Sequence, residues 1–207
     1  MRSSLYNIVF AAALGASCAI LLTGAKELAA DRVAANRRAE KVRHILAVLG
    51  AEYDPAAPAD ELVEVFEATV GESKRGALRV YTYPKGAASP AVAVPVEGRG
   101  LWGPIRGLLA LEPDGRTIRD VTFYEQEETP GLGGEIGSEA FRRRFRGRVA
   151  VSAEGTSGVA LVKPGAALAG ANEIHAISGA TMTCERVEAM VNATLAALEE
   201  EVPSDGE

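Results

Sequence analysis

Apolar residues are concentrated at the start of this chain. No side chain from position 3 to 25 is charged, and most of them are apolar or small. A helix that crosses a bilayer needs about 20 such residues, so the pattern predicts a single transmembrane anchor at 5–25 behind a short tail at 1–4. A cleaved signal peptide and a lipoprotein signal are the alternatives. They fit less well, because apolar residues continue past 15–17 and the leucine before Cys18 lies one position too early.

Helical spacing continues beyond this segment and then gives way to short β-like runs. The helical pattern covers 26–49 and 59–70, with Pro55 and Pro58 between them. Gly and Pro separate the β-like runs, and a last amphipathic helix follows them. The runs cover Ala77–Tyr83, Ala91–Val96, Pro104–Leu111, Thr117–Tyr124 and the surroundings of Val159–Val162, and a further helix is predicted at Ser138–Arg146.

The pattern therefore predicts an α+β protein. A single N-terminal transmembrane helix is followed by one domain with a mainly antiparallel sheet and flanking helices. We expect this domain at 59–202, after a post-membrane helix and linker at 26–58 and before a C-terminal tail at 203–207.

Composition narrows the function further. The chain has 207 residues, a net charge of −6, two cysteines and two histidines. The acidic balance argues against nucleic acid as a partner, and so few cysteines and histidines argue against a disulfide scaffold or a structural zinc site. Ionisable groups inside a membrane helix usually mark an ion path. The predicted anchor has none, so it holds the protein at the lipid bilayer without itself moving ions.

Small residues and hydroxyls gather directly before the last predicted helix, in the run SGATMT at 178–183. The first amide groups of a helix lack partners, and the helix dipole favours negative charge at that end. A phosphate group, or a phosphodiester made through a threonine oxygen, would be stabilised there. An ordinary helix cap is the alternative, because Ser and Thr are preferred caps.

Two further segments could contact a ligand. The run ETPGLGG at 128–134 has three glycines that allow a backbone to approach a flat ligand closely. A solvent-exposed loop is the alternative for this run. Trp102, in the run GLWGP at 100–104, is either a cofactor contact or a core residue.

In this order and spacing, these motifs resemble a known family. The stretch GLWGPIRGLLALEPDGRTIRDVTFYEQEETPGLGGEI followed by SGATMT is similar to NqrC, the FMN-binding component of the sodium-translocating NADH:quinone reductase. It also resembles RnfG of the related Rnf electron-transport complex. The resemblance runs from about Gly98 through the last helix, and the apolar N-terminal segment occupies the place of the family's anchor.

The resemblance implies covalent FMN, joined through its phosphate to Thr181. The small residues Ser178, Gly179 and Ala180 would let a separate flavin transferase reach the hydroxyl. Thr183, a second hydroxyl in the same helical turn, is the alternative acceptor. The ETPGLG loop of the family lies against the flavin ring. The implied ring contacts are Glu128, Thr129, Gly131 and Leu132, with Trp102 as a further candidate. Where the family usually has Asp, this chain has His175, which bears on the efficiency of modification.

The resemblance also implies a place and partners. An electron-carrier subunit of this kind works with the other subunits of a membrane reductase complex. It is a single-pass protein of the bacterial inner membrane with its flavin domain on the periplasmic side. The positive-inside rule points the other way, because basic residues follow the anchor at 26–43. Two alternatives stay open: the Rnf component, and a membrane-anchored binding or assembly protein with no redox role and an unmodified Thr181.

Two other features have simpler interpretations. The basic run at 142–148, with Phe141 and Phe145 four residues apart, indicates a solvated helix face with a small apolar stripe. Lipid phosphate or a partner subunit is the alternative contact for that run. Cys184 is interpreted as a small buried residue rather than a nucleophile.

Overall fold

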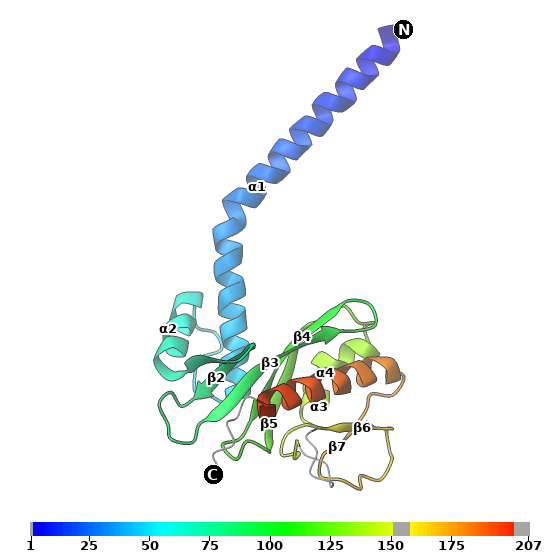
Figure 1. The fold of residues 1–207 in the computed structure, drawn as a ribbon. Coiled ribbons are helices and arrows are strands. Elements are labelled where there is room, and N and C mark those ends of the chain that lie inside the picture. Colours follow the sequence, from blue (N-terminus) through cyan, green and yellow to red (C-terminus); the bar gives the residue numbers. More distant parts are fainter. Residues whose placement is uncertain (1, 151–157, 201–207) are drawn as a thin grey trace. The chain divides into compact units, whose positions relative to one another are not determined.

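The computed structural model describes residues 2–150 and 158–200 (Figure 1). Its first helix, α1 (Arg2–Leu49), is uninterrupted, so the two predicted helical segments at 5–25 and 26–49 are one helix. The chain divides into two compact units, 1–41 and 42–207, and the boundary falls inside α1. Among the described residues, one helix is apolar and long enough to span a membrane; it covers Tyr6–Leu49 and has a mean hydropathy of 2.1 over its most apolar window. One N-terminal apolar helix of this kind fits a single-pass anchor.

The second unit is built around a five-stranded antiparallel sheet in which each strand pairs with the next along the chain. Because every connection joins neighbours, the sheet is a simple meander (Figure 1). The expectation of an α+β domain with a mainly antiparallel sheet is confirmed. The strands are β1 (Gly71–Arg75), β2 (Leu78–Tyr83), β3 (Ala91–Arg99), β4 (Pro104–Leu111) and β5 (Ile118–Glu125).

Both faces of the sheet are covered, which explains the uncharged run at 107–111 in β4. Leu109 and Leu111 belong to the core that the sheet shares with α4 (Thr181–Glu200). The alternate residues Leu108 and Ala110 belong to a second core, formed with α2 (Ala59–Thr69) and the last two turns of α1. Side chains alternate between the faces of a strand, so the part of a strand that is covered on both sides must be apolar at successive positions.

The α4 side of the sheet also carries four shorter elements. They are η1 (Gly133–Gly137), α3 (Glu139–Arg142), and the short parallel pair β6 (Ala160–Val162) and β7 (Glu173–His175). The apolar positions of α4 recur at three- and four-residue spacing and are buried, as its amphipathic pattern predicts. They are Val187, Met190, Val191, Leu195 and Leu198.

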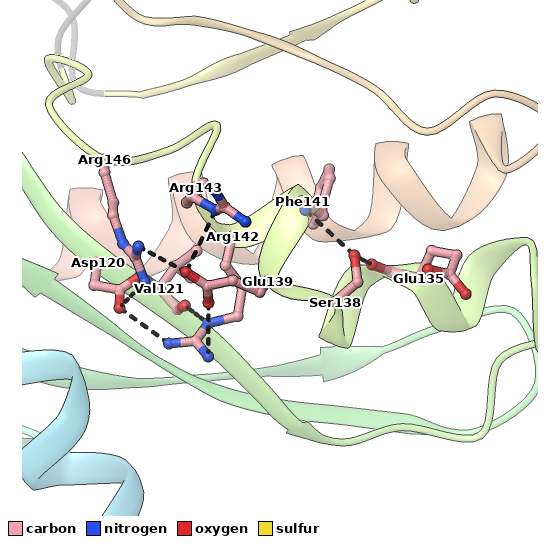
Figure 2. Close-up of polar contacts among 9 residues, drawn as sticks. All are labelled: Asp120, Val121, Glu135, Ser138, Glu139, Phe141, Arg142, Arg143 and Arg146. Atoms are coloured by element: carbon pink, nitrogen blue, oxygen red, sulfur yellow. Dashed lines mark hydrogen bonds and ion pairs between the residues drawn. The ribbon is translucent and has the colours of Figure 1, made fainter.

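The basic run corrects one interpretation, because Arg142 and Arg146 bind other parts of the fold instead of forming a solvated face (Figure 2). Arg142 donates from Nε to Val121 O at 2.6 Å, and its Nη2 lies 3.0 Å from Asp120 Oδ2. Arg146 Nη2 reaches the same oxygen at 2.9 Å and pairs with Glu139 through Nη1 at 2.7 Å. Only 9% of the Asp120 side chain is exposed. The segment after α3 therefore covers the outer edge of β5, where an unpaired strand edge would otherwise face solvent.

Two other predictions were also incomplete. The helix expected at Ser138–Arg146 ends at Arg142. The chain then continues as turns, and Phe145 is buried there against Phe141. Strand β1 was not predicted, because four of its five residues are polar or charged. A polar edge strand has no apolar alternation by which to recognise it.

Candidate functional site

Three segments that are distant in sequence meet at one pocket of about 250 Å³. They are the turn between β3 and β4, the loop that leads into η1, and the start of α4. The turn is closed by a hydrogen bond from Gly100 N to Gly103 O at 2.8 Å. The lining consists of Leu101, Trp102, Glu128, Thr129, Leu132, Gly133, Gly179, Ala180, Thr181, Met182 and Thr183.

The wall of this pocket is apolar at its rim and open to solvent. Leu101, Leu132 and Met182 are between 43% and 53% exposed, and Trp102 is 69% exposed. Large apolar side chains gathered around one opening usually mark a binding surface. A flat, largely apolar ligand would be the natural occupant of such a rim.

Glu128 connects the three segments from inside the wall. Its side chain is buried, with the residue only 4% exposed. Oε1 accepts the backbone N–H groups of Leu101 at 2.8 Å and Trp102 at 3.1 Å, and Oε2 accepts the Thr183 hydroxyl at 2.6 Å. This carboxylate therefore fixes the turn and the first turn of α4 to the loop that carries it. We call Glu128 and these three donors the Glu128 clamp.

Two glycines give the Glu128 clamp its space. A Cβ on Gly100 would lie 2.5 Å from Glu128 Oε1, and a Cβ on Gly133 would lie 2.5 Å from Thr183 Oγ1 and 3.0 Å from Glu128 Oε2. Any larger residue would displace the carboxylate or the hydroxyl. The glycine-rich character of these segments thus serves the clamp as well as the pocket.

The loop after Glu128 turns back on itself at Thr129, whose carbonyl accepts Leu132 N at 3.1 Å and Gly134 N at 2.9 Å. Gly131 has φ +75°, a conformation that disfavours other residues. This turn presents the Leu132 side chain at the pocket rim.

Hydrogen bonds hold successive backbone groups of the segment that precedes α4. Arg144 Nη1 donates to the carbonyls of His175 at 2.9 Å and Ala176 at 2.8 Å. Ile177 N donates to the Cys184 sulfur at 3.3 Å. Cys184 is 2% exposed, as expected, and burial raises the pKa of its thiol. The peptide that leads to Thr181 is therefore held in one conformation.

The two threonines of the SGATMT run lie in different environments. Thr181 is the first residue of α4 and is exposed. Thr183 is 3% exposed, and its hydroxyl is committed to Glu128. Gly179, with φ +77°, turns the chain into the helix, and a Cβ there would lie 3.1 Å from Leu132 Cδ2. Of the two hydroxyls, that of Thr181 is the accessible one.

Thr181 also borders a second hollow of about 520 Å³. Thr181 and Gly179 line both cavities, so the exposed threonine stands between them. The second hollow is more polar in its residues and includes Lys163, Ser178 and Glu185.

Most of the residues expected from the sequence are brought together. Eight of them line the first pocket: Trp102, Glu128, Thr129, Leu132, Gly179, Ala180, Thr181 and Thr183. Ser178 lines the second hollow instead, and Gly131 lies outside both linings. Leu101 and Met182 were missed, although each adjoins a motif residue and could have been inferred from its apolar character. Gly133 was expected only as one of the glycines that allow the backbone to approach a ligand. Glu128 was expected as a ring contact, but its carboxylate oxygens bind the protein itself.

Comparison with known proteins agrees with this geometry. Residues 100–196 match the family model of the FMN-binding domain. NqrC of the Na⁺-translocating NADH-quinone reductase of Vibrio campbellii is 35% identical over 144 residues, which cover 67% of this chain and 55% of that one. The Chlamydia trachomatis NqrC is 39% identical over 139 residues, 60% of this chain and 43% of that one. The chain thus spans about half the length of the curated relatives it matches.

Solved structures show the same fold. The crystal structure of NqrC from Parabacteroides distasonis has a TM-score of 0.70 at 24% identity, covering 83% of this chain and 96% of that one. The Shewanella oneidensis NqrC structure has a TM-score of 0.65 at 23% identity, covering 77% and 93%.

The meander sheet and the pocket thus occur in a chain whose residues 100–196 are similar to an FMN-binding domain. More particularly, the chain is similar to NqrC from the Na⁺-translocating NADH-quinone reductase, which confirms the resemblance drawn from the motifs.

The described residues fit FMN. An apolar rim suits the flat ring, and the exposed Thr181 at a helix N-terminus suits the phosphate group. Leu101, Trp102, Leu132 and Met182 line the pocket and are the residues that could hold such a ring.

Proposed function

We propose that this protein is an electron-carrier subunit of a sodium-translocating NADH:quinone reductase in the bacterial inner membrane, and that it holds FMN covalently on Thr181. One observation carries the proposal: an exposed threonine begins α4 at the edge of an apolar pocket, within a domain of the FMN-binding type. The neighbouring Thr183 supports this choice of acceptor, because its buried hydroxyl already binds Glu128.

Attachment requires an activated flavin. Joining FMN itself to a hydroxyl would release water and is unfavourable in solution, so the donor must carry FMN in a phosphoanhydride, as FAD does. The Thr181 oxygen then forms a new P–O bond, the phosphoanhydride bond breaks, AMP leaves, and the hydroxyl proton is lost. A separate flavin transferase would catalyse this exchange. The unpaired amides of the first turn of α4 would stabilise the phosphodiester charge.

The protein's own residues account for the rest of the role. Bound here, FMN would supply the exchange of electrons, and covalent attachment retains it through every cycle. The apolar rim keeps water from the ring, and α1 provides the anchor in the lipid bilayer. Other subunits of the complex would deliver and remove the electrons, with the flavin domain on the periplasmic side.

The covalent bond is tested by co-expressing the full chain with a flavin transferase and denaturing the product on a gel. We expect flavin fluorescence at the protein band and an FMN-sized mass increase on the peptide 174–186. Thr181→Ala should abolish both signals, and the matched variant Thr183→Ala should retain fluorescence. An unmodified peptide in the wild-type chain would leave a membrane-anchored binding protein, and fluorescence that survives only in Thr181→Ala would identify the other threonine.

The complex is tested separately by purifying the tagged chain from its native membrane. The other components of a sodium-translocating NADH:quinone reductase should copurify with it. Recovery of Rnf-type components instead would assign the chain to the related ferredoxin-linked complex. Protease added to intact spheroplasts should cleave the flavin domain if it is periplasmic, and protection would reverse the proposed orientation.

A further inference from the structure

Glu128 places a carboxylate in the wall of the first pocket. Glu128 is 4% exposed and lines this pocket beside Trp102, Leu132 and Thr183. Burying a carboxylate is unfavourable unless hydrogen bonds compensate for lost water. The Glu128 carboxylate is therefore kept in this buried position by hydrogen bonds from neighbouring residues.

Those interactions stabilise the carboxylate without neutralising it. The three donors of the Glu128 clamp are two backbone amides and one hydroxyl, all of them uncharged. Hydrogen bonds to an ionised group are stronger than neutral ones, so the clamp can hold the side chain in place. No donor of the clamp carries a positive charge that would cancel the charge of the carboxylate.

The glycines show that this arrangement is built for a carboxylate at this point. Gly100 and Gly133 approach its two oxygens so closely that a Cβ on either would collide, at 2.5 Å from Oε1 and 3.0 Å from Oε2. The side chain has little room to move away from the pocket. The carboxylate is consequently fixed relative to the residues that line the pocket.

We propose that Glu128 is a positioning residue whose fixed negative charge lowers the reduction potential of the flavin in this pocket. This inference rests on the proposed function, since it concerns the same site. Each electron that enters a flavin ring adds negative charge unless a proton accompanies it. A nearby carboxylate in a medium of low dielectric constant disfavours that added charge. The oxidised flavin is thereby favoured over the reduced one, and its electrons are passed on more readily.

The test compares midpoint potentials of the flavin-loaded full chain in detergent, by titration with dithionite in the presence of redox dyes. Glu128→Gln keeps the side-chain shape and the Oε1 acceptor but removes the charge, so its potential should shift to a more positive value. Thr183→Val removes one donor but keeps the charge, now less compensated, so its potential should shift to a more negative value. The adjacent, exposed Glu127 gives a matched control, because Glu127→Gln removes a solvent-screened charge.

Opposite shifts in Glu128→Gln and Thr183→Val support an electrostatic role. Equal potentials in the wild-type chain and Glu128→Gln overturn it, and so does a positive shift of the same size in both variants, which loosening of the pocket alone would produce. If Glu128→Gln does not accumulate as a folded protein, a positive shift in Thr183→Val still overturns the inference. A wild-type chain that takes up no flavin overturns the proposed function as well, so the two failures are distinguishable.

Discussion

Replacing Asp120 by alanine should destabilise the flavin domain measurably. The variant removes the acceptor that Arg142 Nη2 and Arg146 Nη2 share, at 3.0 Å and 2.9 Å. Removing one partner of a buried ion pair typically lowers the free energy of unfolding by about 3–5 kcal/mol. Here 20% and 38% of the two arginine side chains are exposed, and Glu139 still pairs with both. Water and Glu139 therefore compensate in part, and we expect a loss of about 2 kcal/mol.

That loss corresponds to a melting temperature lower by roughly 4–8 °C for a domain of this size. Thermal unfolding of the full chain in detergent, followed by near-ultraviolet circular dichroism, measures it. The matched control is Glu72→Ala, because the pair of Glu72 with Arg79 has both side chains about half exposed. That control should change the free energy of unfolding by less than about 1 kcal/mol. Equal melting temperatures for the two variants would refute the structural role assigned to the arginine run.

Three further predictions concern single residues. Gly179→Ala forces a side chain into φ +77° and should lower stability by about 1–2 kcal/mol, with a lower yield of flavin-labelled protein on a gel. The Thr117 hydroxyl and nearby amides hold the pKa of Asp114 below its ordinary value. This carboxyl therefore stabilises the fold at pH values above its pKa in the unfolded chain. The stabilisation is lost as the pH falls through its pKa in the folded chain. Carboxyl chemical shifts against pH should report a depressed midpoint, and an ordinary midpoint would contradict the turn geometry. Burial raises the pKa of the Cys184 thiol, so iodoacetamide should label it slowly at neutral pH and rapidly after unfolding. Peptide masses would show the labelling. Rapid labelling of Cys184 in the folded chain would disprove its burial.

Much of the fold could be predicted because its signals are local. The bounds of β4 follow from an apolar run between Pro104 and the Pro113 turn, and those of α2 from four apolar positions on one helical face. The apolar face of α4 repeats at the helical period for the same reason. Signals of this kind depend only on residues a few positions apart, so they can be recognised without the structure.

The Glu128 clamp could not be predicted in the same way. Glu128 binds groups 26, 27 and 55 positions away in the sequence. The local sequence around a carboxylate in a glycine-rich loop does not distinguish a ligand contact from a buried hydrogen-bond acceptor. The basic run failed for a related reason. Successive arginines on a predicted helix indicate a solvated face, yet their acceptors, Asp120 and the carbonyls of His175 and Ala176, lie on distant strands and loops.

The sequence separation within the Glu128 clamp also sets an order of events in biosynthesis. The clamp joins the turn at 100–103 to α4, the last helix among the described residues, and a chain emerging from the ribosome presents its N-terminal elements first. Neither the pocket nor the exposed Thr181 can be complete until α4 has emerged and packed on the sheet. Under the proposed function, flavin attachment would consequently be confined to chains in which α4 has packed, and a nascent or truncated chain would escape it. Flavin fluorescence at the protein band would then report that this part of the fold is complete.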